Sequence, residues 1–218
     1  MSLSVALVGA GNVSRVHLTA LANSPTVRVV GLYDAVREQA VRRAGEFGIE
    51  RVYDRWEDLL ADPRVDAVGV LLPHDLHHQY TVEALEAGKH VVCEKPMAAS
   101  LAECDAMIAA ARRTGRRLFV VQNRLYYRAY EVMYEHLRAG AIGRVFLAQT
   151  TGFEGPETVG VRPWLGTARP GNGVLMAQAV HPVYTLRWLM GDVARVSALF
   201  GRQKIVDMAA EDTAIATL

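Results

Sequence analysis

The chain has 218 residues, enough for one large domain or two modest ones, and its 51% hydrophobic and 22% charged residues are typical of a globular protein. Its formal net charge of +1 gives no long-range attraction to nucleic acid or anionic lipid, so neither is an expected partner. Two widely spaced cysteines, Cys93 and Cys104, fit neither a disulfide framework nor a zinc knuckle.

The chain shows no secretory signal at its start and no apolar run of membrane-spanning length. We therefore expect a cytoplasmic protein that does not bind a membrane. The two cysteines suit a reducing compartment.

Strands and helices alternate over residues 1–121. Short apolar runs that end near glycine or polar residues predict buried parallel strands, and segments with helical spacing lie between them. The Ser100 and Glu103 pair predicts a capping box at the start of one helix. The expected strands are 3–8, 27–32, 67–72, 90–93 and 118–121, and the expected helices are 13–22, 35–47, 77–87 and 101–114. This alternation predicts an α/β, doubly wound parallel sheet of the Rossmann type.

A different pattern follows residue 121. It predicts helices at 130–139 and 174–190, a Gly- and Pro-containing stretch at 152–173, and strands at 145–151, 193–200 and 212–217. We interpret residues 122–218 as a second, α+β domain with a mixed or antiparallel sheet. Because the chain stops inside the last predicted strand, we expect this domain to be incomplete.

A dinucleotide-binding fingerprint lies where the first strand turns into the first helix. Gly9 permits a tight turn, and Gly11 lets the backbone approach a pyrophosphate at the helix N-terminus, next to Asn12 and Val13. Ser14 stands where a third glycine is usual, and it is small enough for close packing of the helix on the strand. The alternative is that these glycines only form a turn.

Asp34 ends the second strand, where its carboxylate is placed to bind the hydroxyls of the adenosine ribose. The same charge would repel a 2'-phosphate. The sequence therefore predicts NAD as the preferred cofactor, while the nearby Arg37 keeps NADP as the alternative.

Three further motifs resemble the Gfo/Idh/MocA family of NAD(P)-dependent oxidoreductases. Glu94-Lys95-Pro96 is the most specific of them. Pro73 with His77 matches a Pro-Asn-x-x-His segment, with His74 in place of the Asn. The glycine-rich run from Gly171 leads into a helix that carries His181.

The resemblance implies a Rossmann NAD(P)-binding domain over 1–121 and a substrate and oligomerisation domain over 122–218. It implies a sugar, inositol or related polyol as substrate and a homo-oligomer, either a dimer or a tetramer. In the family, the Lys of the Glu-Lys-Pro motif and a later Asp-x-x-x-His pair handle the substrate hydroxyl. The matching residues are Lys95, Ala177 and His181, so the Asp is absent, and Tyr184 replaces an Asp common three residues after the His.

Lys95 and His181 are the candidate catalytic residues. Hydride transfer from an alcohol leaves a hydroxyl proton that a base must accept. Imidazole titrates at about 6.5, and a lysine whose pKa is lowered by burial can serve as well. By residue type alone, a lysine after a strand is usually a surface charge and a histidine in an apolar helix is usually a packing residue. The Glu-Lys-Pro context and the resemblance favour catalytic roles for Lys95 and His181 instead. With Ala177 in place of the Asp, either another residue such as Gln178 or Tyr184 orients His181, or Lys95 carries the proton alone, or catalysis has been lost.

Other candidate site residues follow the predicted strands. Besides the fingerprint, Asp34 and Arg37, the expected cofactor-binding residues are Leu72, Pro73, His74, His77, Glu94, Lys95 and Asn123. Besides Lys95 and His181, the expected substrate-binding residues are Arg124, Tyr126, Trp164 and Gln178. No carboxylate or cysteine completes a ligand set with His74, His77 and His78, so no metal is expected.

These features predict an NAD(P)-dependent dehydrogenase or reductase acting on CH–OH groups. The alternatives are a catalytically silent NAD(P)-binding regulator of the same family and a protein that binds NAD only as a scaffold for assembly.

Overall fold

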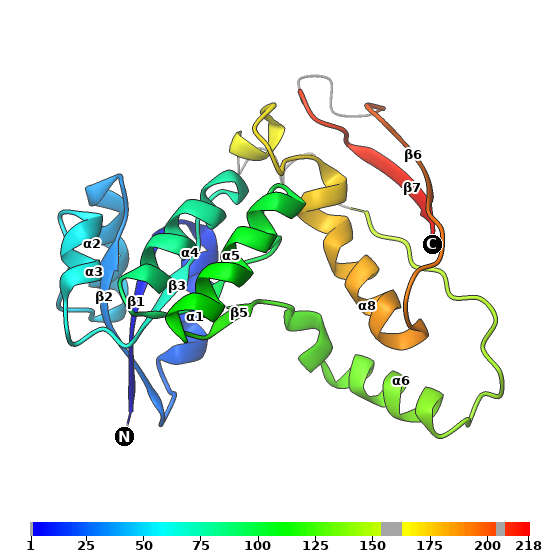
Figure 1. Ribbon diagram of the computed structural model, residues 1–218, viewed down its shortest axis with the longest axis horizontal. Helices are drawn as coiled ribbons and strands as arrows, with labels where there is room; N and C mark the ends of the chain where they lie inside the picture. The colour runs from blue at the N-terminus through cyan, green and yellow to red at the C-terminus, as the bar shows by residue number, and fades with distance from the viewer. Residues whose placement is uncertain (1, 154–162, 204–207) are drawn as a thin grey trace. The chain divides into compact units, whose positions relative to one another are not determined.

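The computed structural model describes residues 2–153, 163–203 and 208–218 (Figure 1). The chain divides into two compact units, residues 1–121 and 122–218. Within the described residues, no helix is long and apolar enough to cross a membrane.

The first unit contains a five-stranded parallel sheet with strand order β2-β1-β3-β4-β5. The apolar runs form strands because they are covered on both faces, and in β3 both Val68 and Val70 are fully buried. The predicted doubly wound parallel sheet is confirmed. The strands are β1 (Leu3–Val8), β2 (Val27–Tyr33), β3 (Ala67–Val70), β4 (His90–Cys93) and β5 (Leu118–Val120).

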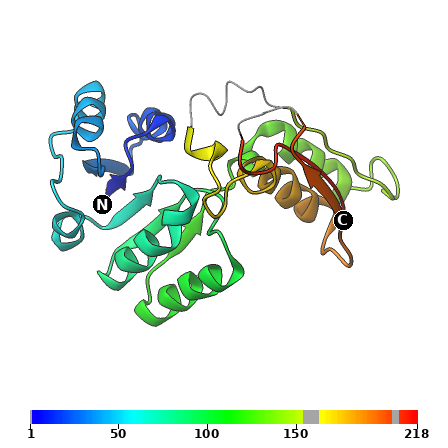
Figure 2. The same cartoon turned by 90° about the horizontal axis from the view of Figure 1, so that it is seen from above.

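Two buried clusters cover the sheet. One packs α1 (Asn12–Leu21) and α2 (Arg37–Phe47) through Leu18, Ala40 and Ala44. The other packs α3 (Trp56–Ala61), α4 (His77–Glu86) and α5 (Leu101–Thr114), and α4 and α5 lie side by side (Figure 1 and Figure 2). The capping box predicted for α5 is confirmed: the Glu103 N–H donates to Ser100 Oγ at 3.3 Å, and Glu103 Oε2 accepts from the Ser100 N–H at 3.1 Å.

The connections reverse direction between β1 and β3. From β1 the chain passes to β2 on one side, and from β3 it passes to β4 and β5 on the other. In open α/β sheets, ligands bind outside the carboxyl ends of the strands at such a reversal. The loops after β1 and β3 therefore form the expected ligand-binding edge.

The second unit combines helices with a two-stranded antiparallel sheet. Tyr134 of α6 stacks on Trp188 of α8 with ring centroids 4.3 Å apart, which joins the two helices. The elements are the 3-10 helices η2 (Asn123–Tyr126) and η3 (Pro163–Gly166), α6 (Arg128–Arg138), the π-helical segment η4 (Leu175–Ala179), α8 (Val180–Met190), β6 (Ser197–Gly201) and β7 (Thr213–Thr217).

One predicted strand is wrong. Residues 145–151 form no strand, and Phe146 and Leu147 are 89% and 72% exposed. A strand needs a hydrogen-bonded neighbour, and within the described residues β6 and β7 pair only with each other. Of the Gly- and Pro-containing stretch 152–173, residues 154–162 lie outside the described residues.

Candidate functional site

The glycine loop after β1 is shaped by contact with the loop after β3. Gly9 has φ +97°, and a Cβ there would lie 2.3 Å from the Leu71 carbonyl oxygen. Gly11 is the N-cap of α1 and gives it no side-chain capping bond, and nothing lies within 4 Å of where its Cβ would stand. The first amides of α1 are therefore accessible, which fits the pyrophosphate of a dinucleotide.

The Asp34 carboxylate joins the end of β2 to this loop. Asp34 Oδ2 accepts a hydrogen bond from the Ala10 N–H at 2.7 Å, and Oδ1 accepts one from the Val36 N–H at 2.8 Å. A carboxylate has about four acceptor positions, so two further bonds can be accepted, as binding of a ribose diol requires. Asp34 thus follows β2 and contacts the glycine loop, and its binding of a ribose stays a prediction.

Arg37, at the start of α2, is engaged with another residue. Its Nε lies 2.5 Å from Asp54 Oδ1, and both side chains are mostly exposed. The hydrogen bond and charge of Asp54 raise the pKa of Arg37. A 2'-phosphate would have to compete with Asp54 for this guanidinium.

His77 connects the loops after β3 and β4. Its ring is fully buried, with Nδ1 2.7 Å from the Pro96 carbonyl oxygen and Nε2 2.9 Å from the Leu72 carbonyl oxygen. Burial lowers the pKa of His77, although the two carbonyl contacts oppose that shift. The structure thus uses both ring nitrogens within the protein. Pro73 precedes η1 (His74–Leu76), and the buried His74 packs edge-on against the His77 ring at 5.8 Å.

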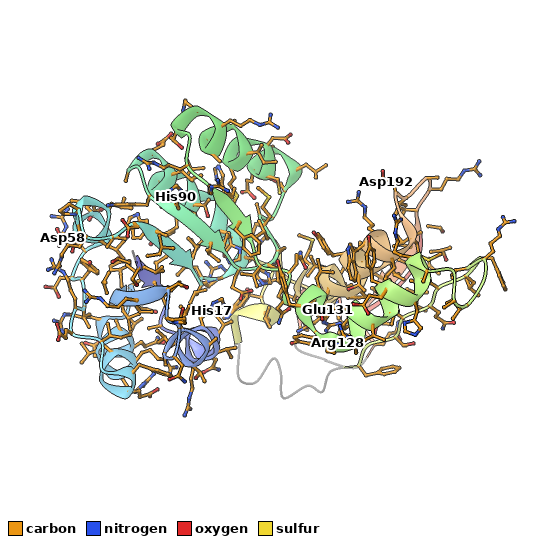
Figure 3. All side chains as sticks on the ribbon, turned by 90° about the horizontal axis from the view of Figure 1, so that it is seen from below. His17, Asp58, His90, Arg128, Glu131 and Asp192 are labelled. Carbon is orange, nitrogen blue, oxygen red and sulfur yellow. The ribbon has the colours of Figure 1, made fainter. Side chains whose placement is uncertain are left out.

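Glu94 and Lys95 directly follow β4. Glu94 Oε1 lies 2.7 Å from Nε2 of His17, which is labelled on α1 in Figure 3, and Glu94 Oε2 accepts from the Lys95 N–H at 3.1 Å. Burial would raise the pKa of Glu94, but His17 and Lys95 together hold it below its usual value. The Lys95–Pro96 peptide is cis. The Glu94 carboxylate therefore fixes the backbone from which Lys95 projects.

The candidates that follow β5 lie in the second unit, on η2. Asn123 Nδ2 donates to Tyr127 Oη at 3.3 Å, Arg124 is half-buried, and Tyr126 is 67% exposed. None of these contacts assigns a ligand, so their binding roles stay predictions.

Gln178 and His181 lie one helical turn apart, Gln178 in η4 and His181 in the first turn of α8. His181 is 8% exposed, and its carbonyl oxygen accepts from Thr185 Oγ1 at 2.9 Å. Ala177 is buried at 6% exposure. The half-buried Trp164 lies in η3, and its carbonyl oxygen accepts bonds from Thr167 and Asn172.

Several contacts were missed by the sequence reasoning. Glu211 Oε1 accepts from the Leu175 N–H at 3.0 Å, which caps the helical segment that leads to His181. Arg43 donates to the glycine loop from α2. Glu211 and Leu175 are 36 residues apart in the chain, and Arg43 is 29 residues from Ser14 and 32 from Gly11. No local sequence pattern predicts contacts at such separations. Among the described residues, no group of three or more His, Cys, Asp or Glu is arranged to hold a metal.

Comparison with known proteins assigns the family. A family model described as the oxidoreductase family with an NAD-binding Rossmann fold matches residues 3–122, and the GFO/IDH/MocA C-terminal domain model matches residues 130–218. The chain belongs to the GFO/IDH/MocA oxidoreductase family. The predicted resemblance is confirmed, and the first unit contains the NAD-binding Rossmann domain of this family.

Relatives within the GFO/IDH/MocA family include sugar-converting enzymes. The 1,5-anhydro-D-fructose reductase of Ensifer adhaerens is 32% identical over 85% of this chain, and the D-apiose dehydrogenase of Paraburkholderia graminis is 33% identical over 96%. The chain spans only 56% and 55% of these two relatives. The structure of the WlbA dehydrogenase from Bordetella pertussis in complex with NADH and UDP-GlcNAcA is 29% identical with a TM-score of 0.86, over 99% of this chain and 62% of that one.

Proposed function

We propose that this chain binds NAD at the carboxyl edge of its parallel sheet and acts in an NAD-dependent dehydrogenase or reductase. The reaction is hydride transfer between nicotinamide and a CH–OH or carbonyl group of a sugar, inositol or related polyol. The cofactor supplies the hydride chemistry, and the protein supplies binding, orientation and proton transfer. We further propose a homo-oligomeric assembly.

The arrangement of Asp34 and the glycine loop carries the proposal. The first amides of α1 are accessible beside Gly11, and one Asp34 carboxylate oxygen is tied to the Ala10 N–H. This arrangement offers hydrogen-bond donors for a diphosphate and acceptors for a ribose at one edge of the sheet. The negative charge of Asp34 and the engagement of Arg37 with Asp54 both favour NAD over NADP.

Lys95 and His181 are the proposed proton-transfer residues. Lys95 follows β4 at the carboxyl edge, and the bond from its N–H to Glu94 fixes its backbone. His181 lies in the first turn of α8, directly after the segment whose first amide donates to Glu211. Either group can accept the proton that leaves the substrate hydroxyl during oxidation and return it during reduction.

Cofactor binding is tested first, by calorimetry with NAD+, NADH, NADP+ and NADPH. We expect NAD to bind in at least one redox form. The Kd of NADP should be at least about ten times that of NAD, because the 2'-phosphate would meet an uncompensated carboxylate. Asp34→Asn, which removes the charge but keeps an acceptor for the Ala10 N–H, should reduce this preference. Absence of binding in all four titrations of the folded protein contradicts the proposal.

Turnover is tested by following NADH absorbance with a panel of sugars, inositols and polyols. Lys95→Met and His181→Ala should each lower kcat by about a hundredfold or more while NAD affinity changes little, because general acid–base catalysis contributes about that much. His136→Ala, at an exposed histidine of α6, is the matched control. Wild-type turnover in either variant removes that residue from the mechanism.

A second candidate function is an NAD-binding regulator without turnover. Ala177 favours it, because the position expected to orient His181 holds a buried methyl group instead of a carboxylate. NAD binding together with no turnover of any panel substrate supports this candidate over the enzyme.

A further inference from the structure

We propose that Arg43 is a positioning residue for binding of the dinucleotide diphosphate. It acts through its hydrogen bonds to Ser14 and to the Gly11 carbonyl oxygen, which hold the glycine loop in place. This inference rests on the proposed function, because it assumes that the loop binds a dinucleotide. It adds a residue that no part of the fingerprint contains.

The guanidinium of Arg43 is inserted between α2 and the start of α1. Its side chain is only 7% exposed, its Nε donates to Ser14 Oγ at 3.1 Å, and its Nη2 donates to the Gly11 carbonyl oxygen at 3.2 Å. Ser14 Oγ in turn donates to the same carbonyl oxygen at 2.6 Å. The Gly11 carbonyl thus accepts two hydrogen bonds from the interior of the unit.

These bonds reinforce the direction in which the next amide points, which the start of α1 already favours. In a planar trans peptide the C=O and the following N–H point in opposite directions. Holding the Gly11 carbonyl toward Arg43 therefore directs the Asn12 N–H away from the protein interior, and Asn12 is an exposed residue. An amide fixed in this way is ready to donate to a phosphate oxygen without reorganisation.

Ser14 takes part in this arrangement through its hydroxyl. The residue is fully buried, and its Oγ is both the acceptor for Arg43 and a donor to Gly11. The replacement of the usual third glycine thus adds a side chain that links Arg43 to the loop. A glycine or alanine at this position would leave the Arg43 Nε without this acceptor.

The charge of Arg43 is partly balanced by Glu46. Arg43 Nη1 lies 2.5 Å from Glu46 Oε2, and the Glu46 side chain is 39% exposed. The carboxylate reduces the positive field that the guanidinium projects toward a bound anion. We therefore attribute the effect of Arg43 mainly to its hydrogen bonds with the loop.

The test compares ligands that contain or lack the diphosphate. We would measure the Kd of NAD+ and ADP-ribose by calorimetry, and that of adenosine by competition, for the wild type, Arg43→Met, Arg43→Lys, Ser14→Ala and Glu46→Gln. Arg43→Met should weaken NAD+ and ADP-ribose about tenfold, the effect of losing charged hydrogen bonds, and leave adenosine unchanged. Arg43→Lys should recover part of the loss. Glu46→Gln, which removes the negative charge beside Arg43 but keeps an acceptor, should bind NAD+ as the wild type does or more tightly.

The outcomes separate the inference from the proposed function. If the wild type binds neither NAD nor NADP, the proposed function fails. If the wild type binds NAD+ and a folded Arg43→Met variant binds it equally well, or weakens adenosine by the same factor, the inference fails. If Arg43→Met does not fold, Ser14→Ala decides: a loss of about threefold for NAD+ alone supports the inference, and wild-type affinity overturns it.

Discussion

His17 of α1 donates a hydrogen bond from Nε2 to Glu94 Oε1, 2.7 Å away, and so links the first helix to the residue that directly follows β4. Glu94 also accepts from the Lys95 N–H, so one carboxylate holds both the helix that begins at the glycine loop and the backbone of the proposed catalytic lysine. Both side chains are largely buried, at 22% and 13% exposure. The pair therefore joins α1, which begins at the glycine loop, to the segment after β4 that carries Lys95.

We expect His17 and Glu94 to be energetically coupled. A double-mutant cycle with His17→Ala and Glu94→Gln, measured by urea unfolding, should give a coupling of about 1 to 2 kcal/mol, the value for a charge-assisted bond between partly buried groups. Arg113→Ala and Glu86→Gln form the control cycle at an exposed ion pair, with about 0.5 kcal/mol expected. Additive effects of His17→Ala and Glu94→Gln would contradict the coupling.

His77→Phe tests the link between the loops after β3 and β4. Phenylalanine keeps a ring but removes the contacts of the ring nitrogens with the Leu72 and Pro96 carbonyl oxygens, one of which accepts a hydrogen bond from the neutral imidazole. We expect a loss of about 1 to 3 kcal/mol of unfolding free energy. His78→Phe, at the half-buried neighbour, should cost less. Equal losses in the two variants would show that the carbonyl contacts contribute nothing.

His77 also predicts a pH dependence. Burial lowers its pKa in the folded state, so the unfolded chain binds a proton more readily. The folded state is then favoured above the ordinary histidine pKa of about 6.5, and stability falls as the pH drops below that value. Urea unfolding between pH 7 and 5 should show a shallower pH slope for His77→Phe than for the wild type. Parallel slopes would refute this assignment.

Asp62 should control stability at lower pH. Its buried carboxylate accepts from Tyr53 Oη at 2.8 Å and from the Arg64 guanidinium at 2.7 Å. The Arg64 bond, which outweighs burial, holds the pKa of Asp62 well below its usual value. The stabilisation is present above the unfolded pKa of about 4 and is lost as the pH falls further.

The same site predicts a large mutational effect. Asp62→Ala should cost about 3 kcal/mol at pH 7, because it leaves the Tyr53 hydroxyl buried without its acceptor. Glu50→Gln, at an exposed carboxylate, is the control, with a change within about 0.5 kcal/mol. A loss at Asp62 no larger than that at Glu50 would remove it from the stabilising network.

Gly9 and Gly11 should respond differently to alanine. In Gly9→Ala, the alanine would have to adopt φ +97°, and its Cβ would lie 2.3 Å from the Leu71 carbonyl oxygen. We therefore expect the free energy of unfolding to fall by more than about 2 kcal/mol, or the variant not to fold. Gly11→Ala meets nothing within 4 Å and should fold with a loss of about 1 kcal/mol or less. Its methyl group occupies the approach to the α1 amides, so NAD+ binding should weaken about tenfold or more. Thermal unfolding and calorimetry check the two effects.

The first unit was predictable because its signals are local. Apolar runs marked all five strands, and Ser100 with Glu103 marked the start of α5. The short α3 (Trp56–Ala61) was missed because a segment of this length shows too little periodicity. The strand predicted at 145–151 failed because apolar residues alone do not supply a hydrogen-bonded neighbour.

The candidate site was predictable in part. The residues that match the fingerprint and the Glu-Lys-Pro motif lie at strand ends, so their sequence positions already placed them at the carboxyl edge. The contacts that hold these residues could not be predicted from local sequence. His17 and Glu94 are 77 residues apart, and Ser14 and Arg43 are 29 residues apart. Only the folded sheet brings such partners together.

The tie between Asp34 and Ala10 matters for any attempt to redesign cofactor preference. Replacing Asp34 with a small apolar residue to admit NADP would also cut the 2.7 Å bond that anchors the turn after β1. A successful redesign must therefore retain an acceptor there, such as an asparagine or serine oxygen, and obtain its new specificity from neighbouring positions. The residue proposed to select the nucleotide thus also anchors this turn, and a redesign has to treat the two roles separately.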